Sequence, residues 1–125
     1  MGPVLAIATA TVVALLSGCG ASDSGIPADR EFTGYYTNSF ENSLFIPCGS
    51  QERWWAVGSS LEVAAARRVP GNGNMGAPSV TWFARVRGVV TTEGAWGHMG
   101  GYSRQLMVHR VSELRAPRAS DCGRT

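Results

Sequence analysis

The sequence predicts a mainly β domain: a five-stranded OB-like barrel with one helix between strands 3 and 4. The first observation is the order of the local patterns, in which three strand-like runs precede one helical segment and two more strand-like runs follow it. The second is the placement of Gly34 and Gly88 inside such runs, where a closing sheet needs sharp bends. Closure also removes sheet edges that would aggregate. The alternative is an open antiparallel sheet covered by one helix.

Three short runs open the domain. Residues 32–37 (FTGYYT) are rich in aromatic residues and Thr, which favour strands, and residues 43–47 (SLFIP) and 53–57 (RWWAV) repeat this composition. The polar segment 38–42 between the first two runs is typical of a turn.

The period of the pattern then changes to that of a helix. Ser59 followed three residues later by Glu62 fits a capping box, with Ser59 as the cap. Pro70 and Gly71 end the predicted helix. The residues expected on its apolar face are Leu61, Ala64, Ala65 and Val69.

Two longer strands complete the order. Residues 80–92 alternate between an apolar and a mixed face, and a bend or bulge is expected near Gly88. In the last strand, residues 104–114, Leu106 and Val108 share a face but Val111 is out of phase with them. A bulge near residues 109–110 would return Val111 to the core.

An export signal precedes the domain. Residues 4–16 form an uncharged apolar run that is shorter than the roughly 20 residues of a spanning helix, as in a signal peptide. The next residues, Leu16-Ser17-Gly18-Cys19, resemble the bacterial lipobox. The resemblance implies a lipoprotein signal peptide over residues 1–18 and acylation of Cys19, which partners the chain with a lipid bilayer. Because Gly20 is not Asp, it also implies the outer membrane, with the domain facing the periplasm.

Several short strings carry a further resemblance. The segments FTGYY (32–36), SLFIPCG (43–49), Trp54-Trp55 and GHMGGY (97–102) resemble small bacterial envelope lipoproteins with an OB-like domain. The domain is similar to the C-terminal domain of NlpE-type lipoproteins. The expected organisation is a flexible tether over residues 19–29 and the OB-like domain over residues 30–125.

Cysteine usage follows from the lipobox resemblance. If Cys19 carries lipid, Cys48 and Cys122 remain, and in an oxidising compartment we expect them to form a disulfide. The bridge would close a loop of about 75 residues and stabilise the fold by about 4.5 kcal/mol. A free thiol or a metal thiolate are the alternatives. We expect the polar tail, residues 116–125, to be ordered by the disulfide alone.

Composition narrows the classes of partner. The chain has 125 residues, enough for one domain, and a formal net charge of +2, too weak to indicate a nucleic-acid partner. An envelope protein or glycan is the expected partner.

The loop over residues 93–103 (EGAWGHMGGYS) is the candidate ligand-binding site. It holds four of the 16 glycines together with Trp96, His98 and Tyr102. In OB folds the loop joining strands 4 and 5 flanks the ligand face on strands 2 and 3. The aromatic rings could then stack on a ligand and His98 could hydrogen-bond to it. The alternative is that these side chains only pack and make turns. Of Trp54 and Trp55, the outward ring would indicate binding only if it lies beside this loop.

The sequence gives weaker indications of metal binding and of catalysis. His98 and His109, with Met75, Met99 and Met107, are residue types that bind copper or zinc, but their spacing is not compact, so no metal site and no cofactor are predicted. The sequence has no GxSxG, HExxH or P-loop motif, and no enzyme is predicted. We therefore expect a non-enzymatic, membrane-anchored envelope lipoprotein that binds a protein, peptide or glycan. A periplasmic metal-handling lipoprotein is the alternative.

Overall fold

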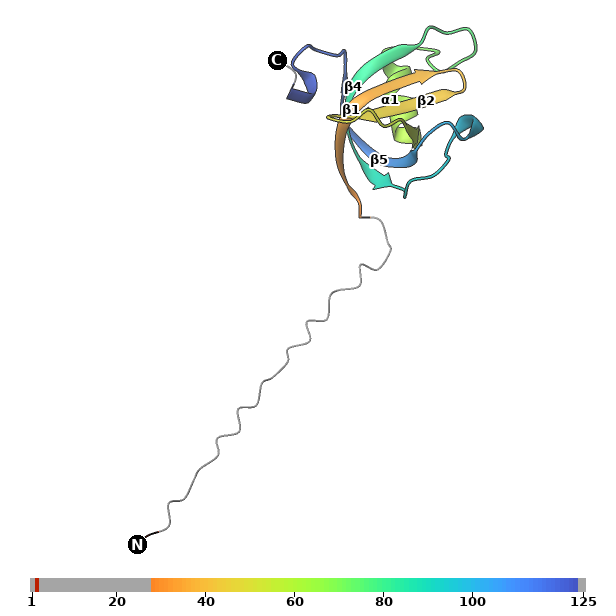
Figure 1. The fold of residues 1–125 in the computed structure, drawn as a ribbon. Coiled ribbons are helices and arrows are strands. Elements are labelled where there is room, and N and C mark those ends of the chain that lie inside the picture. The colour runs from red at the N-terminus through yellow and green to blue at the C-terminus, as the bar shows by residue number, and fades with distance from the viewer. Residues whose placement is uncertain (1, 3–27, 124–125) are drawn as a thin grey trace.

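The computed structural model of the chain describes Gly2 and residues 28–123 (Figure 1). Apart from Gly2, the predicted signal peptide lies outside the described residues, as do the predicted lipidation site Cys19 and the tether up to residue 27. The elements in chain order are β1 (Arg30–Ser39), β2 (Asn42–Pro47), β3 (Trp54–Val57), α1 (Ser59–Arg68), β4 (Val80–Val90), the 3-10 turn η1 (His98–Gly100), β5 (Arg104–Arg115) and the 3-10 turn η2 (Asp121–Gly123).

The strands form one closed barrel in the order β1-β2-β3-β5-β4, and β4 pairs again with β1. β3 and β5 run parallel, whereas every other neighbouring pair runs antiparallel. The single α-helix of the described residues follows β3 and precedes β4. The predicted OB-like barrel with its helix between strands 3 and 4 is therefore confirmed, and the open sheet is not formed.

Apolar side chains from all five strands and α1 fill the barrel. The core cluster comprises Tyr36, Phe45, Trp54, Ala56, Leu61, Ala65, Trp82, Ala84, Val86, Leu106, Val108 and Leu114. The rings of Tyr36 and Trp82 stack with centroids 6.0 Å apart. From the helix, Leu61 and Ala65 are buried, and Ala64 packs beside them, as the apolar spacing predicted.

Glycine is required where strands approach one another most closely. A Cβ atom added to Gly34 would lie 2.2 Å from the carbonyl oxygen of Ile46 on β2. One added to Gly88 would lie 2.1 Å from the carbonyl oxygen of Met107 on β5. With glycine at these positions, β1 can lie directly against β2, and β4 can lie directly against β5, as expected of Gly residues at barrel bends.

The register between β4 and β5 shifts twice. Arg87 pairs with Arg110 but the next residue, Gly88, pairs with Val108, so His109 is the extra residue on β5. The bulge predicted near residues 109–110 is confirmed, and Val111 packs against the core. A second shift leaves Ser112 without a register partner, and its hydroxyl donates to the carbonyl oxygen of Arg85 instead.

The start of the helix differs from the prediction. The N-cap residue is Gly58, not Ser59, and no side chain caps the helix. Gly58 has φ 137°, and an added Cβ would lie 2.4 Å from the carbonyl oxygen of Val108. The chain turns so tightly against β5 here that only glycine fits the cap position, and Ser59 becomes the first helical residue.

The disulfide joins Cys48, just after β2, to Cys122 in η2, with the two Cα atoms 5.0 Å apart. The expectation that only this bond orders the tail is wrong. Asp121 is buried, and its carboxylate accepts two hydrogen bonds from the Arg115 guanidinium, at 3.1 and 2.5 Å. It also accepts the backbone N–H of Arg118 at 2.6 Å. The sequence did not reveal this contact because a short polar segment does not show which carboxylate will be buried.

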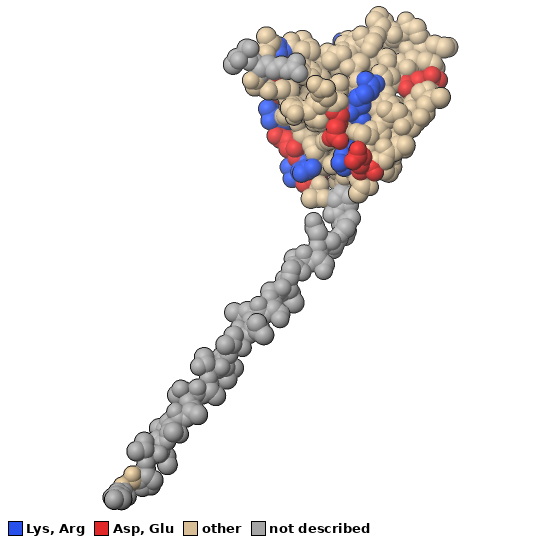
Figure 2. Space-filling model, viewed as in Figure 1, with Lys and Arg blue, Asp and Glu red and all other residues tan. Residues whose placement is uncertain are grey.

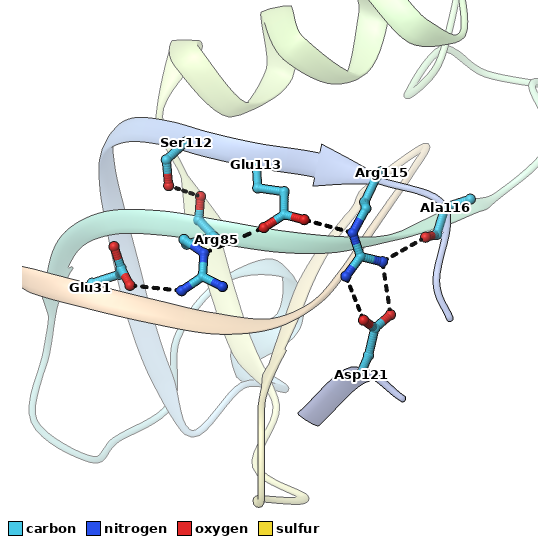
Figure 3. A network of polar contacts seen from close by, with 7 residues as sticks. All are labelled: Glu31, Arg85, Ser112, Glu113, Arg115, Ala116 and Asp121. Carbon is cyan, nitrogen blue, oxygen red and sulfur yellow. Dashed lines mark hydrogen bonds and ion pairs between the residues drawn. The ribbon is translucent and has the colours of Figure 1, made fainter. Parts of the chain in front are cut away.

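Arg115 belongs to a row of alternating charges on the outside of the barrel (Figure 3). The row runs from Glu31 on β1 through Arg85 on β4 and Glu113 on β5 to Arg115 and Asp121. The Arg115 guanidinium also lies 4.4 Å from the ring centroid of Phe83, which it covers. The hydrogen bond from Arg115 lowers the pKa of the Glu113 carboxyl, and the hydrogen bonds to Asp121 and Glu113 raise the pKa of Arg115.

Charged side chains are unevenly distributed on the face shown in Figure 2. Arg and acidic residues alternate over the half of the barrel where β1 begins, whereas the region over the loop that precedes β4 is largely uncharged. In the described part of the chain, no helix has both the length and the apolar character needed to cross a membrane.

The Asp121 carboxylate makes the stability of the fold depend on pH. Arg115 lowers the pKa of Asp121 in the folded protein, so its contribution is complete above the unfolded pKa of about 3.9 and is lost as the pH falls through the folded pKa. We expect Asp121→Asn to lower the free energy of unfolding at pH 7, and the difference from the unmodified protein to shrink below about pH 4. Urea unfolding across this pH range measures both.

Glu93→Gln, at an exposed carboxylate, is the control and should leave the free energy of unfolding unchanged. A difference for Asp121→Asn that stays constant down to the lowest pH would contradict the assignment.

Candidate functional site

The segment between β4 and β5 is a short ladder rather than an irregular loop. Trp96 and Tyr102 pair through both backbone hydrogen bonds, at 2.9 and 3.2 Å, and the N–H of Gly94 donates to the carbonyl oxygen of Ser103. The turn η1 closes the ladder at its tip. Residues 93–103 therefore hold a defined conformation and project from the barrel as one unit (Figure 1).

Tyr102 attaches this ladder to the barrel. It is 7% exposed, its ring lies 4.9 Å from that of Trp55 on β3, and the Arg53 guanidinium lies 5.7 Å from its centroid. Its hydroxyl donates to the side-chain oxygen of Asn42 at the start of β2. The ligand-binding role predicted for Tyr102 remains untested, but its buried ring positions the loop and is not displayed to solvent.

Trp55 is the outward member of the tryptophan pair. Trp54 is buried in the core, so the alternation of β3 turns Trp55 to the outer face, which it shares with its register partner Leu44 on β2. Gly97 lies directly on Trp55, because a Cβ added there would be 2.5 Å from Cδ2 of the indole. Trp55 is therefore the outward ring of the pair, and it lies beside the Gly-rich loop, as a binding role would require. It also lies on the face of strands 2 and 3.

Trp96 folds back on its own loop. Its indole nitrogen donates to the carbonyl oxygen of Thr92 at 3.1 Å, and the side chain is half-buried. Part of the Trp96 side chain therefore remains accessible to solvent.

His98 lies at the exposed tip and meets the turn between β1 and β2. Its Nε2 is 3.9 Å from Oε2 of Glu41, and both side chains are about half exposed. Next to them in sequence, Met99 is 90% exposed and Phe40 is 49% exposed. We refer to Phe40, Glu41, His98 and Met99 as the tip patch. Each of the two loops that border the ligand face of OB folds thus carries one exposed apolar residue next in sequence to a member of the polar pair.

Of the tip patch, only His98 is a ligand-binding residue predicted from the sequence. Trp96, His98 and Tyr102 were predicted, but only His98 reaches the tip. Phe40 and Glu41 were assigned to a turn without a role. An aromatic residue inside an otherwise polar turn was the available signal for Phe40.

The two histidines among the candidate metal ligands belong to different segments of the fold. His109 is the exposed extra residue of the β5 bulge, whereas His98 lies at the tip of the loop that precedes β5. Among the residues that the structure describes, no group of three or more His, Cys, Asp or Glu side chains could hold a metal ion.

The conformation of Gly97 generates a prediction. Its φ of 67° and ψ of −158° lie in a region that only glycine adopts readily, and an added Cβ would overlap Trp55. We expect Gly97→Ala to destabilise the protein by about 1–3 kcal/mol and to expose Trp55, which urea unfolding and tryptophan fluorescence measure.

Gly101→Ala is the matched control in the same loop. Gly101 has φ −82°, and a Cβ there would lie 3.6 Å from its nearest neighbour, an ordinary contact. Equal effects of the two substitutions would show that Trp55 and the loop are not in contact.

Comparisons of the chain with protein-family models, with curated proteins and with solved structures find no match.

Proposed function

We propose that this chain is a membrane-anchored lipoprotein of the bacterial envelope that binds a protein, peptide or glycan and catalyses no reaction. The observation that carries the binding role is the meeting of two loop tips beside Trp55. The β1–β2 turn and the β4–β5 loop approach within 3.9 Å at Glu41 and His98. These are the loops that flank the ligand face in OB folds.

The chemistry of the tip patch favours a protein or peptide over a glycan as the ligand. Met99 and Phe40 expose apolar surface, which contributes to binding when it is covered. Trp55, the ring on which a sugar would stack, is partly covered by Gly97 and Tyr102. The exposed pair of Glu41 and His98 adds orientation more than affinity, because ion pairs at the surface contribute little.

The anchor rests on the lipobox resemblance around Cys19. Acyl chains bind a bilayer by about 0.8 kcal/mol per buried CH2, so two or more chains hold a protein stably at the membrane. The proposed location is the outer membrane, with the barrel facing the periplasm. Metal handling remains the alternative, supported by residue types alone.

Acylation of Cys19 is directly testable in a bacterial host. We expect the chain to incorporate labelled palmitate and to sediment with membranes, and Cys19→Ala to lose both properties because the thiol is the acylation site. Cys48→Ala, which removes a cysteine of the disulfide instead, should still take up the label. Membrane association and labelling of Cys19→Ala would sink the lipoprotein proposal.

The tip patch is tested by photocrosslinking in the envelope. A photoreactive amino acid in place of Met99 should yield a discrete crosslinked product, and adding Phe40→Ser should reduce that product because apolar contact is lost. The matched control is the same probe in place of Met75, which is 79% exposed in the loop before β4. Identical products from both positions, or none from Met99, would contradict a binding role for the tip patch.

A further inference from the structure

A groove of about 310 Å³ lies between α1 and the second half of β5. The helix contributes side chains at spacings of three and four residues, which form one stripe along it: Ser60, Val63, Ala64, Arg67 and Arg68. The strand contributes residues 111–114. This volume is at the lower end of ligand pockets, which span about 300–1,000 Å³. The groove accordingly suits a short stretch of chain.

One wall of this groove is a strand edge. β5 pairs with β3 only from Arg104 to Met107, and then continues to Arg115 with β4 as its only strand partner among the described residues. The helix covers the two ends of this edge, because Gly58 abuts the Val108 carbonyl and Arg68 donates to the Leu114 carbonyl at 2.6 Å. Between these ends, no strand of the described residues pairs with this side of β5, and an unpaired strand edge can accept an added extended segment.

The charge of the groove favours an acidic occupant. Arg67 is exposed and makes no ion pair within the described part of the chain. Arg68 is bonded to two backbone carbonyls, which leave its charge uncompensated. The one acidic residue of the lining, Glu113, is already paired with two arginines of the outer row, Arg85 and Arg115. The net charge facing the groove is therefore positive.

We propose that the groove between α1 and the free edge of β5 binds an extended acidic peptide segment. The segment adds a short strand beside residues 111–113 of β5. Its small apolar side chains cover Val63 and Ala64, and a carboxylate meets Arg67. This surface is separate from the tip patch, since it uses the end of β5 remote from the β4–β5 loop. The proposal does not depend on the proposed function.

The test uses the purified protein and a short capped peptide of alternating valine and glutamate. Backbone NMR titration should shift the amides of residues 60–68 and 111–114 and leave residues 96–102 unchanged. Arg67→Glu should weaken the affinity about tenfold, because it replaces attraction by repulsion at an exposed site that leaves the fold intact. Arg118→Glu carries the same charge change on the tail and should leave the affinity unchanged.

Two altered peptides separate strand addition from charge attraction. A peptide of alternating valine and lysine should not bind, and N-methylation of the valine–glutamate peptide along one edge should abolish binding because it removes backbone donors. Shifts that map to the tip patch would overturn the proposal. So would equal effects of the two charge reversals, unchanged binding of the methylated peptide, or the absence of binding to any peptide.

Discussion

The parallel pairing of β3 with β5 closes the sheet into a barrel, and the surfaces of the molecule depend on where that pairing starts and stops. β3 is only four residues long, so the ladder extends from Arg104 to Met107 and no further. At its start, the Arg53 carbonyl accepts the N–H of Ser103, which places the β4–β5 loop over Trp55. Beyond Met107, β5 pairs with β4 but not with β3 and leaves an edge beside α1. One short ladder thus produces both the tip patch and the groove.

At the β4–β5 loop, a buried aromatic residue supports the structure, whereas exposed side chains at the tip carry the proposed binding role. Tyr102 bridges β2, β3 and the loop, so its ring is unavailable to a ligand but gives the tip a defined position. A rigid loop binds with less loss of conformational entropy than a mobile one. The side chains left at the tip, Phe40 and Met99, are apolar and exposed. Buried residues thus support the loop, and different, exposed residues carry the proposed contact with a ligand.

The C-terminal tail is held by one covalent and one noncovalent constraint. The Cys48–Cys122 bond limits how far the tail can move, and the buried Asp121 carboxylate fixes its orientation through Arg115. Arg115 in turn covers Phe83, an apolar ring on the outer face of β4. The row of alternating charges therefore covers apolar surface, and its opposite charges also compensate one another.

The elements of this fold follow from local sequence alone. Alternation in residues 80–92, the helical spacing from Leu61 to Val69 and the phase change at Val111 each determine a segment, because side-chain period reflects the backbone conformation of that segment. The order of these segments was enough to predict an OB-like barrel. The pairing of Cys48 with Cys122 followed from the cysteine count once Cys19 was assigned to lipid.

Contacts between distant segments were decided only by the tertiary structure. Nothing near Glu41 in the sequence indicates that it faces His98, and nothing near Asp121 indicates a buried carboxylate. Gly58 replaced Ser59 as the cap because β5 lies against it, and Tyr102 became a buried support because Trp55 lies beneath the loop. Such contacts depend on the register between strands, which no local pattern encodes.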